Sequence, residues 1–180
     1  MKRIIPILLL KDRLLYKTIN FQNETYIGDP FVALKIFNEK EVDELVILDI
    51  NKSSIEPDFD FLNQLASEAF MPLSYGGGIN CVDTAEKIFR IGFEKVVINS
   101  ANINDFSLIE SISSRFGNQA VVCCVDYKIN FFGKRICTFN NGRNSINAKI
   151  NDFIKEAIEA GSGEILLQCI NYEGKMQKMD

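Results

Sequence analysis

Met71-Pro72-Leu73-Ser74-Tyr75-Gly76-Gly77-Gly78-Ile79 is the stretch from which the expected fold follows. A short apolar run ends at three glycines, a helical pattern covers 82–91, and Gly92 precedes a second apolar run from Lys95. This order predicts one βαβ unit. Glycines at a strand end leave backbone N–H groups beside a helix N-terminus, which suits an anion. We predict a phosphate site there; the alternative is that the glycines only permit a tight turn. The predicted ligands are Gly76, Gly77 and Gly78, with Asn99 and Ser100 from the next strand.

The composition excludes several classes of function. The chain has 180 residues, a net charge of −4 and no histidine, so nucleic acid is not an expected partner and the usual general base is missing. No apolar run is long enough to span a bilayer and no signal-peptide pattern occurs, which predicts a cytoplasmic protein without a membrane partner. Five cysteines without a C-x-x-C pair predict reduced thiols. We expect no metal and no cofactor.

Strands and helices alternate six times along the chain. Apolar runs at 4–10, 45–48, 71–76, 95–98, 120–127 and 165–167 are separated by predicted helices, which indicates a parallel sheet. Asp29 and Pro30 predict a helix start, and Asn151 or Asp152 is expected to cap a helix that ends at Gly161. The stretch 11–27 is expected to be a long loop or a hairpin.

An internal repeat favours a barrel over an open sheet. Residues 43–50 match residues 163–170, and Leu8-Leu9-Leu10-Lys11 matches Val125-Asp126-Tyr127-Lys128. Both offsets are roughly 120 residues, half the length of a (βα)₈ TIM barrel. We therefore predict a single domain over 1–180 that is a TIM barrel truncated after about its sixth strand, with the last two βα units missing.

Asp126 is the strongest candidate for acid–base chemistry. It ends the apolar run 121–125 at the carboxyl end of a strand, where barrel active sites lie. Burial there would raise its pKa toward the working range of an acid or base. The alternative is an Asp that caps the next segment. Lys17 and Lys128 are candidate partners for Asp126 or for a substrate phosphate.

Four charged residues open apolar strands at the opposite ends, with alternating sign: Arg3, Glu44, Lys95 and Glu164. Charges where a strand leaves solvent are ordinary. The same four residues could also meet at the base of a barrel and form a charged ring around its axis.

The sequence resembles the cyclase subunit of imidazole glycerol phosphate synthase (HisF), a family of ribulose-phosphate-binding barrels, over essentially the whole chain. The motifs that carry the resemblance occur in that family's order and spacing. They are Arg3-Ile4-Ile5-Pro6, Lys17, Asn20-Phe21, Gly28-Asp29-Pro30, Asp43-Glu44-Leu45, Leu48-Asp49-Ile50, Gly76-Gly77-Gly78-Ile79, Lys95, Ile98-Asn99, Arg115-Phe116-Gly117, Asp126, and Gly161 with Gly163-Glu164-Ile165-Leu166-Leu167.

The resemblance implies a (βα)₈ barrel docked at its base on a glutaminase subunit (HisH-like), with ammonia travelling up the barrel. It also implies that Arg3, Glu44, Lys95 and Glu164 are gate residues at the channel entrance, and that the glycine turn with Asn99 and Ser100 is one of two phosphate sites. Asp126 matches the second of the family's two catalytic aspartates.

Leu9 stands where the first catalytic aspartate of that family falls. Leucine cannot exchange a proton, and the loss of one acid–base partner typically costs about 10²–10⁴ in rate. The sequence resembles most the branch of HisF-like proteins that belongs to acetamidino sugar modification in surface polysaccharide synthesis. That branch implies a phosphorylated or nucleotide-linked substrate and a separate amidotransferase enzyme. The alternatives are the cyclase of histidine biosynthesis, a non-catalytic scaffold for the glutaminase, and a phosphosugar isomerase barrel.

Overall fold

The computed structural model describes residues 2–51, 56–99, 105–146 and 149–176. It divides into two compact units, which are described separately. The first unit comprises Met1–Lys17 and Thr25–Val97, and the second comprises Thr18–Glu24 and Ile98–Asp180. No helix of the described residues is long and apolar enough to span a membrane.

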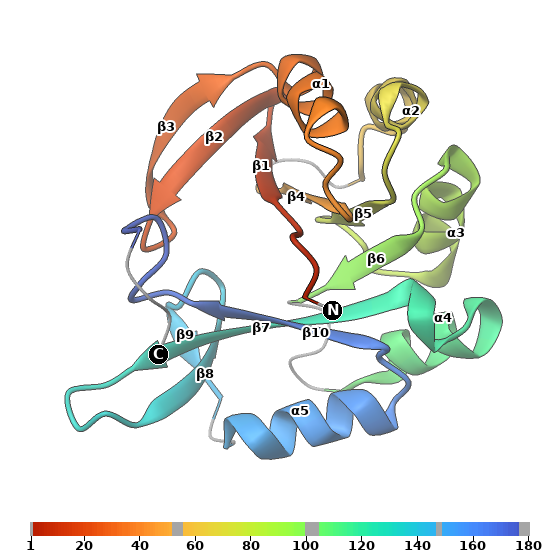
Figure 1. The fold of residues 1–180 in the computed structure, drawn as a ribbon. Helices are drawn as coiled ribbons and strands as arrows, with labels where there is room; N and C mark the ends of the chain where they lie inside the picture. Colours follow the sequence, from red (N-terminus) through yellow and green to blue (C-terminus); the bar gives the residue numbers. More distant parts are fainter. Residues whose placement is uncertain (1, 52–55, 100–104, 147–148, 177–180) are drawn as a thin grey trace. The chain divides into compact units, whose positions relative to one another are not determined.

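Parallel strands with helical connections form the first unit (Figure 1). Four of its strands are parallel neighbours in the order β1, β4, β5, β6, and β2 pairs with β1 in antiparallel register. The strands are β1 (Ile7–Lys11), β2 (Leu14–Ile19), β3 (Gln22–Gly28), β4 (Leu45–Asp49), β5 (Leu73–Gly76) and β6 (Lys95–Ile98), and the helices are α1 (Pro30–Glu39), α2 (Phe59–Glu68) and α3 (Val82–Ile91). The end of β2, the start of β3 and the last residue of β6 are grouped with the second unit.

Local sequence signals set the helix ends of this unit. The Asp29 carboxylate accepts hydrogen bonds from the backbone of Phe31 and Val32, so it caps α1 as predicted. Gly92 ends α3 in the left-handed conformation, at φ +116°, as glycine does at this position. The predicted helix 82–91 is therefore confirmed. Leu34, Leu62 and Ile88 are almost fully buried core residues on the three helices.

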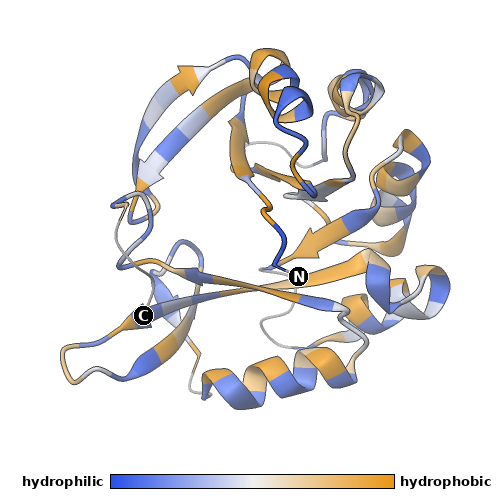
Figure 2. Cartoon of the chain, viewed as in Figure 1, coloured by the Kyte–Doolittle hydropathy of each residue, from blue (hydrophilic) through white to orange (hydrophobic). Residues whose placement is uncertain are grey.

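The second unit also combines parallel and antiparallel strands. Strand β10 pairs in parallel with β7, while β8 pairs with β7 and β9 pairs with β8 in antiparallel register. Hydrophobic and hydrophilic residues alternate along α5 (Figure 2), and its buried members are Phe153 and Ala157. The elements are α4 (Ser107–Phe116), a 3₁₀ turn (Asn118–Ala120), β7 (Val121–Ile129), β8 (Arg135–Phe139), β9 (Asn144–Ser145), α5 (Ile150–Glu159) and β10 (Glu164–Cys169).

Two predicted boundaries were wrong. The first strand begins at Ile7 rather than at Ile4, whose side chain is exposed. Helix α5 begins at Ile150 after Lys149, without a side-chain cap, so Asn151 and Asp152 lie inside its first turn. A cap contributes only about 1 kcal/mol, which is less than the burial of an aromatic side chain such as Phe153 contributes. Packing of the apolar face therefore outweighs the capping signal.

Candidate functional site

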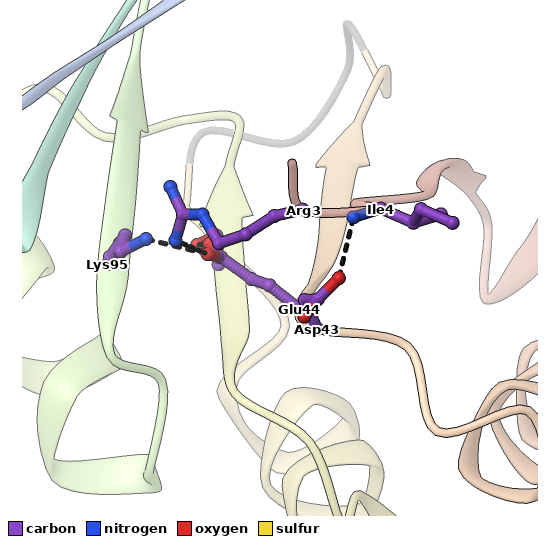
Figure 3. Close-up of polar contacts among 6 residues, drawn as sticks. Arg3, Ile4, Asp43, Glu44 and Lys95 are labelled. Carbon is purple, nitrogen blue, oxygen red and sulfur yellow. Dashed lines mark hydrogen bonds and ion pairs between the residues drawn. The ribbon is translucent and has the colours of Figure 1, made fainter. Parts of the chain in front are cut away.

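Glu44 is the centre of a buried charged cluster in the first unit (Figure 3). Its carboxylate lies 2.6 Å from Lys95 Nζ and 3.5 Å from a guanidinium nitrogen of Arg3. The hydroxyl of Ser74 donates to the other carboxylate oxygen at 2.5 Å. Glu44 and Lys95 are buried, whereas the side chain of Arg3 is half exposed. The structure therefore brings together three of the four charged residues that the sequence singled out.

The position of Arg3 depends on its neighbours Ile4 and Asp43. The backbone N–H of Ile4 donates to the Asp43 carboxylate at 2.6 Å, and the backbone N–H of Asp43 donates to the Ile4 carbonyl at 3.3 Å. These two bonds attach the N-terminal segment beside the start of β4 (Figure 3). The segment has no strand partner of its own at Ile4, so this attachment holds Arg3 over Glu44.

Ser74 is a member of this cluster that the sequence analysis did not identify. Its hydroxyl is fully buried on β5, and its bond to Glu44 satisfies it. A serine inside a strand that is apolar on both faces is the sequence signal that could have indicated such a partner. Glu164, the fourth predicted gate residue, begins β10 in the second unit. Its convergence with the other three stays a prediction.

The glycine turn after β5 is set by packing and by backbone angles. A Cβ at Gly77 would lie 2.5 Å from the carbonyl oxygen of Asp49, and Gly77 has φ +124°. A Cβ at Gly76 would lie 2.8 Å from a methyl group of Leu48. Gly78 has φ +65°, and a Cβ there would meet only Pro57, at an ordinary contact distance of 3.6 Å. Packing thus accounts for two of the glycines, and the third leaves a bare backbone at the surface.

The remaining predicted phosphate ligands are distributed differently. Asn99 belongs to the second unit, Ser100 lies outside the described residues, and Lys17 is exposed on β2. The shared phosphate site of these residues and the glycines stays a prediction.

Asp49 lies next to the glycine turn, at the carboxyl end of β4. It accepts hydrogen bonds from the backbone of Asn51 at 2.8 Å and from the hydroxyl of Tyr75 at 3.3 Å. Burial raises the pKa of Asp49, although these two bonds act in the opposite direction. Asp49 is thus a titratable group at a strand end in addition to Asp126, which the sequence favoured.

Asp126 lies on β7 in the second unit and is 5% exposed. Its Oδ2 accepts a hydrogen bond from the Asn99 amide at 2.9 Å, and its Oδ1 accepts a long one from the Cys124 thiol at 3.7 Å. The Cys124 thiol also lies 3.5 Å from the amide oxygen of Gln168. Side chains of Asn99, Cys124, Asp126 and Thr138 line a small pocket, which Phe153 also borders.

Burial raises the pKa of the Asp126 carboxyl group, and the bonds from Asn99 and Cys124 only partly oppose this effect. A carboxyl group with a raised pKa in a small polar pocket is suited to donate or accept a proton. Lys128, one of its two predicted partners, instead donates to the carbonyl oxygen of Gly142 at 2.8 Å. Asn99 was predicted as a phosphate ligand, but its side-chain amide donates to Asp126 and lies 3.5 Å from the Cys124 sulfur.

The five cysteines form no disulfide. Cys81 is exposed, and Cys123, Cys124, Cys137 and Cys169 are buried. Burial raises the pKa of the Cys124 thiol well above its ordinary value. Among the described residues, no three side chains of His, Cys, Asp or Glu are grouped as a metal site would require.

Comparison with known proteins identifies the family. Residues 3–180 match the model of the family described as histidine biosynthesis protein. A Pseudomonas aeruginosa protein, provisionally named imidazole glycerol phosphate synthase subunit hisF2, is 45% identical over 99% of this chain and 72% of its own length. A provisionally named HisF of Leptospira interrogans is 44% identical, with 99% and 71% covered. The imidazole glycerol phosphate synthase subunit HisF of Streptococcus sanguinis is 36% identical, with 99% and 72% covered. The parallel-rich α/β fold is consistent with the TIM-barrel-like domain of this family. The chain therefore belongs to the histidine biosynthesis protein family, among its HisF-like members.

Proposed function

We propose that this chain is the ammonia-accepting subunit of a glutamine-dependent amidation system. A HisH-like glutaminase docks at the base and releases ammonia, and the HisF-like chain uses or relays it toward a phosphorylated or nucleotide-linked substrate. The proposed reaction is conversion of an acetamido group to an acetamidino group on a sugar of a surface polysaccharide, with help from a separate amidotransferase. The observation that carries the proposal is the buried cluster of Arg3, Glu44, Ser74 and Lys95.

The charges of this cluster favour passage of a neutral molecule. The Glu44 carboxylate is contacted by two cations and one hydroxyl, so its negative charge is balanced within the protein. An ion that enters such a site loses its hydration at a high cost, whereas neutral ammonia loses much less. A buried ion cluster is also weak as a stabilising device compared with apolar packing, which supports a functional reason for it.

Leu9 supports a reaction other than imidazole ring closure. It lies on β1, in register with Leu48 of β4, and has no group that could exchange a proton. Asp126, the other predicted acid–base residue, retains a buried carboxyl group with a raised pKa. Retention of the proposed channel residues with loss of one catalytic aspartate fits a chain that receives ammonia for a different acceptor.

The deciding experiment compares glutamine with ammonium salt as the nitrogen source for amidation by the purified chain and its glutaminase. Lys95→Ala is expected to abolish amidation driven by glutamine and to leave amidation driven by ammonium salt within about threefold, because external ammonia need not enter at the base. Lys35→Ala, at an exposed position of α1, is the matched control and should change neither reaction. Equal activity of Lys95→Ala with both sources would contradict the channel.

A second set of variants separates this role from the alternatives. A non-catalytic scaffold would be favoured if Asp126→Asn left amidation in cells intact while Lys95→Ala abolished it. Turnover of the ribulosyl-aminoimidazole substrate by the native chain with ammonium salt would favour the histidine-pathway cyclase. Turnover that appears only after Leu9→Asp would exclude that cyclase. Failure to bind any glutaminase would favour a phosphosugar isomerase.

A further inference from the structure

Two adjacent phenylalanines form the end of the β7–β8 hairpin. Phe131 and Phe132 are 99% and 90% exposed, and their rings contact each other edge to face with centroids 5.7 Å apart. The hairpin end extends away from the strands of its own unit, with hydrophobic residues at the end and hydrophilic residues beside it (Figures 1 and 2). The two exposed rings form a contiguous apolar patch, and such patches mark sites of contact with a protein or a membrane.

The backbone of this turn is hydrogen-bonded within itself. The Asn130 side-chain oxygen accepts from the backbone N–H groups of Phe132 and Lys134, at 3.0 and 2.9 Å. Gly133 donates to the Asn130 carbonyl, and Asn130 donates to the Lys134 carbonyl, both at 3.0 Å. Apolar surroundings penalise an unpaired backbone donor strongly. A tip whose donors at 132, 133 and 134 are already bonded can enter such surroundings at low cost.

The segment that carries the tip is cationic. Exposed Lys134 and Arg135 follow the phenylalanines after Gly133. Between Asp126 and Asp152 the sequence contains five basic residues and no acidic residue, although the whole chain has a net charge of −4. Local positive charge on an acidic protein indicates a negatively charged counterpart for this segment.

The apolar area of the hairpin end decides whether a protein or a lipid bilayer fits as its partner. Two phenylalanines offer about 300–500 Å², at roughly 150–250 Å² for each aromatic side chain. A specific protein interface needs about 800 Å² on each side. Interfacial binding to a bilayer needs only a few apolar side chains at the boundary and basic residues beside anionic headgroups.

We propose that residues 130–135 dock reversibly on an anionic lipid surface, with Phe131 and Phe132 inserted at the boundary of headgroups and acyl chains. Lys134 and Arg135 then lie among the headgroups. This mode needs no spanning segment, so it agrees with the lack of a spanning helix in the described part of the chain. The expectation from sequence of no membrane partner considered only spans and signal peptides, and it stays the alternative to this proposal. The proposal does not depend on the amidation reaction.

A tryptophan reporter tests insertion directly, because the chain contains no tryptophan. Phe132→Trp is expected to shift its emission to shorter wavelength with vesicles of 70% phosphatidylcholine and 30% phosphatidylglycerol, and not with phosphatidylcholine alone. Phe70→Trp is the matched control, because Phe70 is 87% exposed but lies in the other unit. No shift for Phe132→Trp, or an equal shift for Phe70→Trp, would overturn the proposal.

Vesicle flotation of the full chain gives the second measurement. Phe131→Ser with Phe132→Ser should weaken binding to the anionic vesicles at least tenfold, as should Lys134→Glu with Arg135→Glu, while Phe70→Ser should stay within twofold of the native chain. Binding should also fall as salt is raised from 50 to 300 mM. Native binding that is absent, or that survives both double substitutions, would contradict docking through this tip.

Discussion

At the scale of single residues, Glu44 illustrates how much one buried charge can matter. Glu44→Gln keeps the shape but leaves Lys95 buried without its carboxylate, so we expect a loss of about 3 kcal/mol in the free energy of unfolding. Glu86→Gln removes the partner of Arg90 in an exposed pair on α3 and should cost at most about 0.5 kcal/mol. Urea unfolding of both variants provides the comparison, and equal losses would argue against a special role for the cluster.

The raised pKa of Asp126 gives stability a definite pH dependence. Below the ordinary value of 3.8 the carboxyl group is protonated in both states and has no effect. As pH rises from 3.8 to the raised native value, the unfolded chain ionises first, so stability falls across that interval and then stays level. Asp126→Asn should remove this fall, as measured by urea unfolding at a series of pH values. A variant that retains the full fall would show that another group causes it.

At the scale of the elements, alanine substitution at two glycines in turns distinguishes the cost of backbone strain from the cost of steric collision. Gly77→Ala should cost about 3 kcal/mol, because a positive φ strains alanine and its Cβ would collide with the Asp49 backbone. Gly133→Ala, at φ +73° with open space, should cost only about 1 kcal/mol of strain. Thermal unfolding of the two variants measures the difference, and similar losses would mean that the turn relaxes around Cβ.

Helix caps show where a sequence signal corresponds to a structural contact. Asp29→Ala removes the bonds to Phe31 and Val32 and should cost about 1 kcal/mol of stability. Asn151→Ala should change stability by less than about 0.5 kcal/mol, since Asn151 lies within the first turn of α5 and is exposed. Unfolding midpoints in urea would distinguish these cases, and a larger effect at Asn151 would reverse the assignment of the cap.

The hairpin β2–β3 shows why one element was only partly predicted. Its turn places Asn20 and Phe21 at φ +53° and +60°, and the preceding turn places Asp12 and Arg13 at positive φ. Such turns usually contain glycine, and none of these four positions does. The sequence 11–27 therefore lacked the signal that would have distinguished a hairpin from a loop.

At the scale of the whole molecule, the positions of β1, β4, β5, β6, β7 and β10 along the chain were predictable, because apolar runs and glycine stops are local signals. The charged residues at strand starts, such as Glu44 and Lys95, were predictable for the same reason. The bonds of Ser74 to Glu44 and of Asn99 to Asp126 were not, since they depend on how neighbouring strands are aligned. Position along a strand can be inferred from sequence, whereas the partner of a buried polar group requires the register of the sheet.

Cys81 has a practical consequence. Its exposed thiol has a pKa lowered by a hydrogen bond from Thr84, while burial raises the pKa of the Cys124 and Cys137 thiols. A maleimide dye added to the native chain should therefore attach at Cys81 alone, at the N-terminus of α3, without removal of any other cysteine. The molecule thus carries a built-in fluorescent labelling position, from which its encounters with other molecules can be followed in real time.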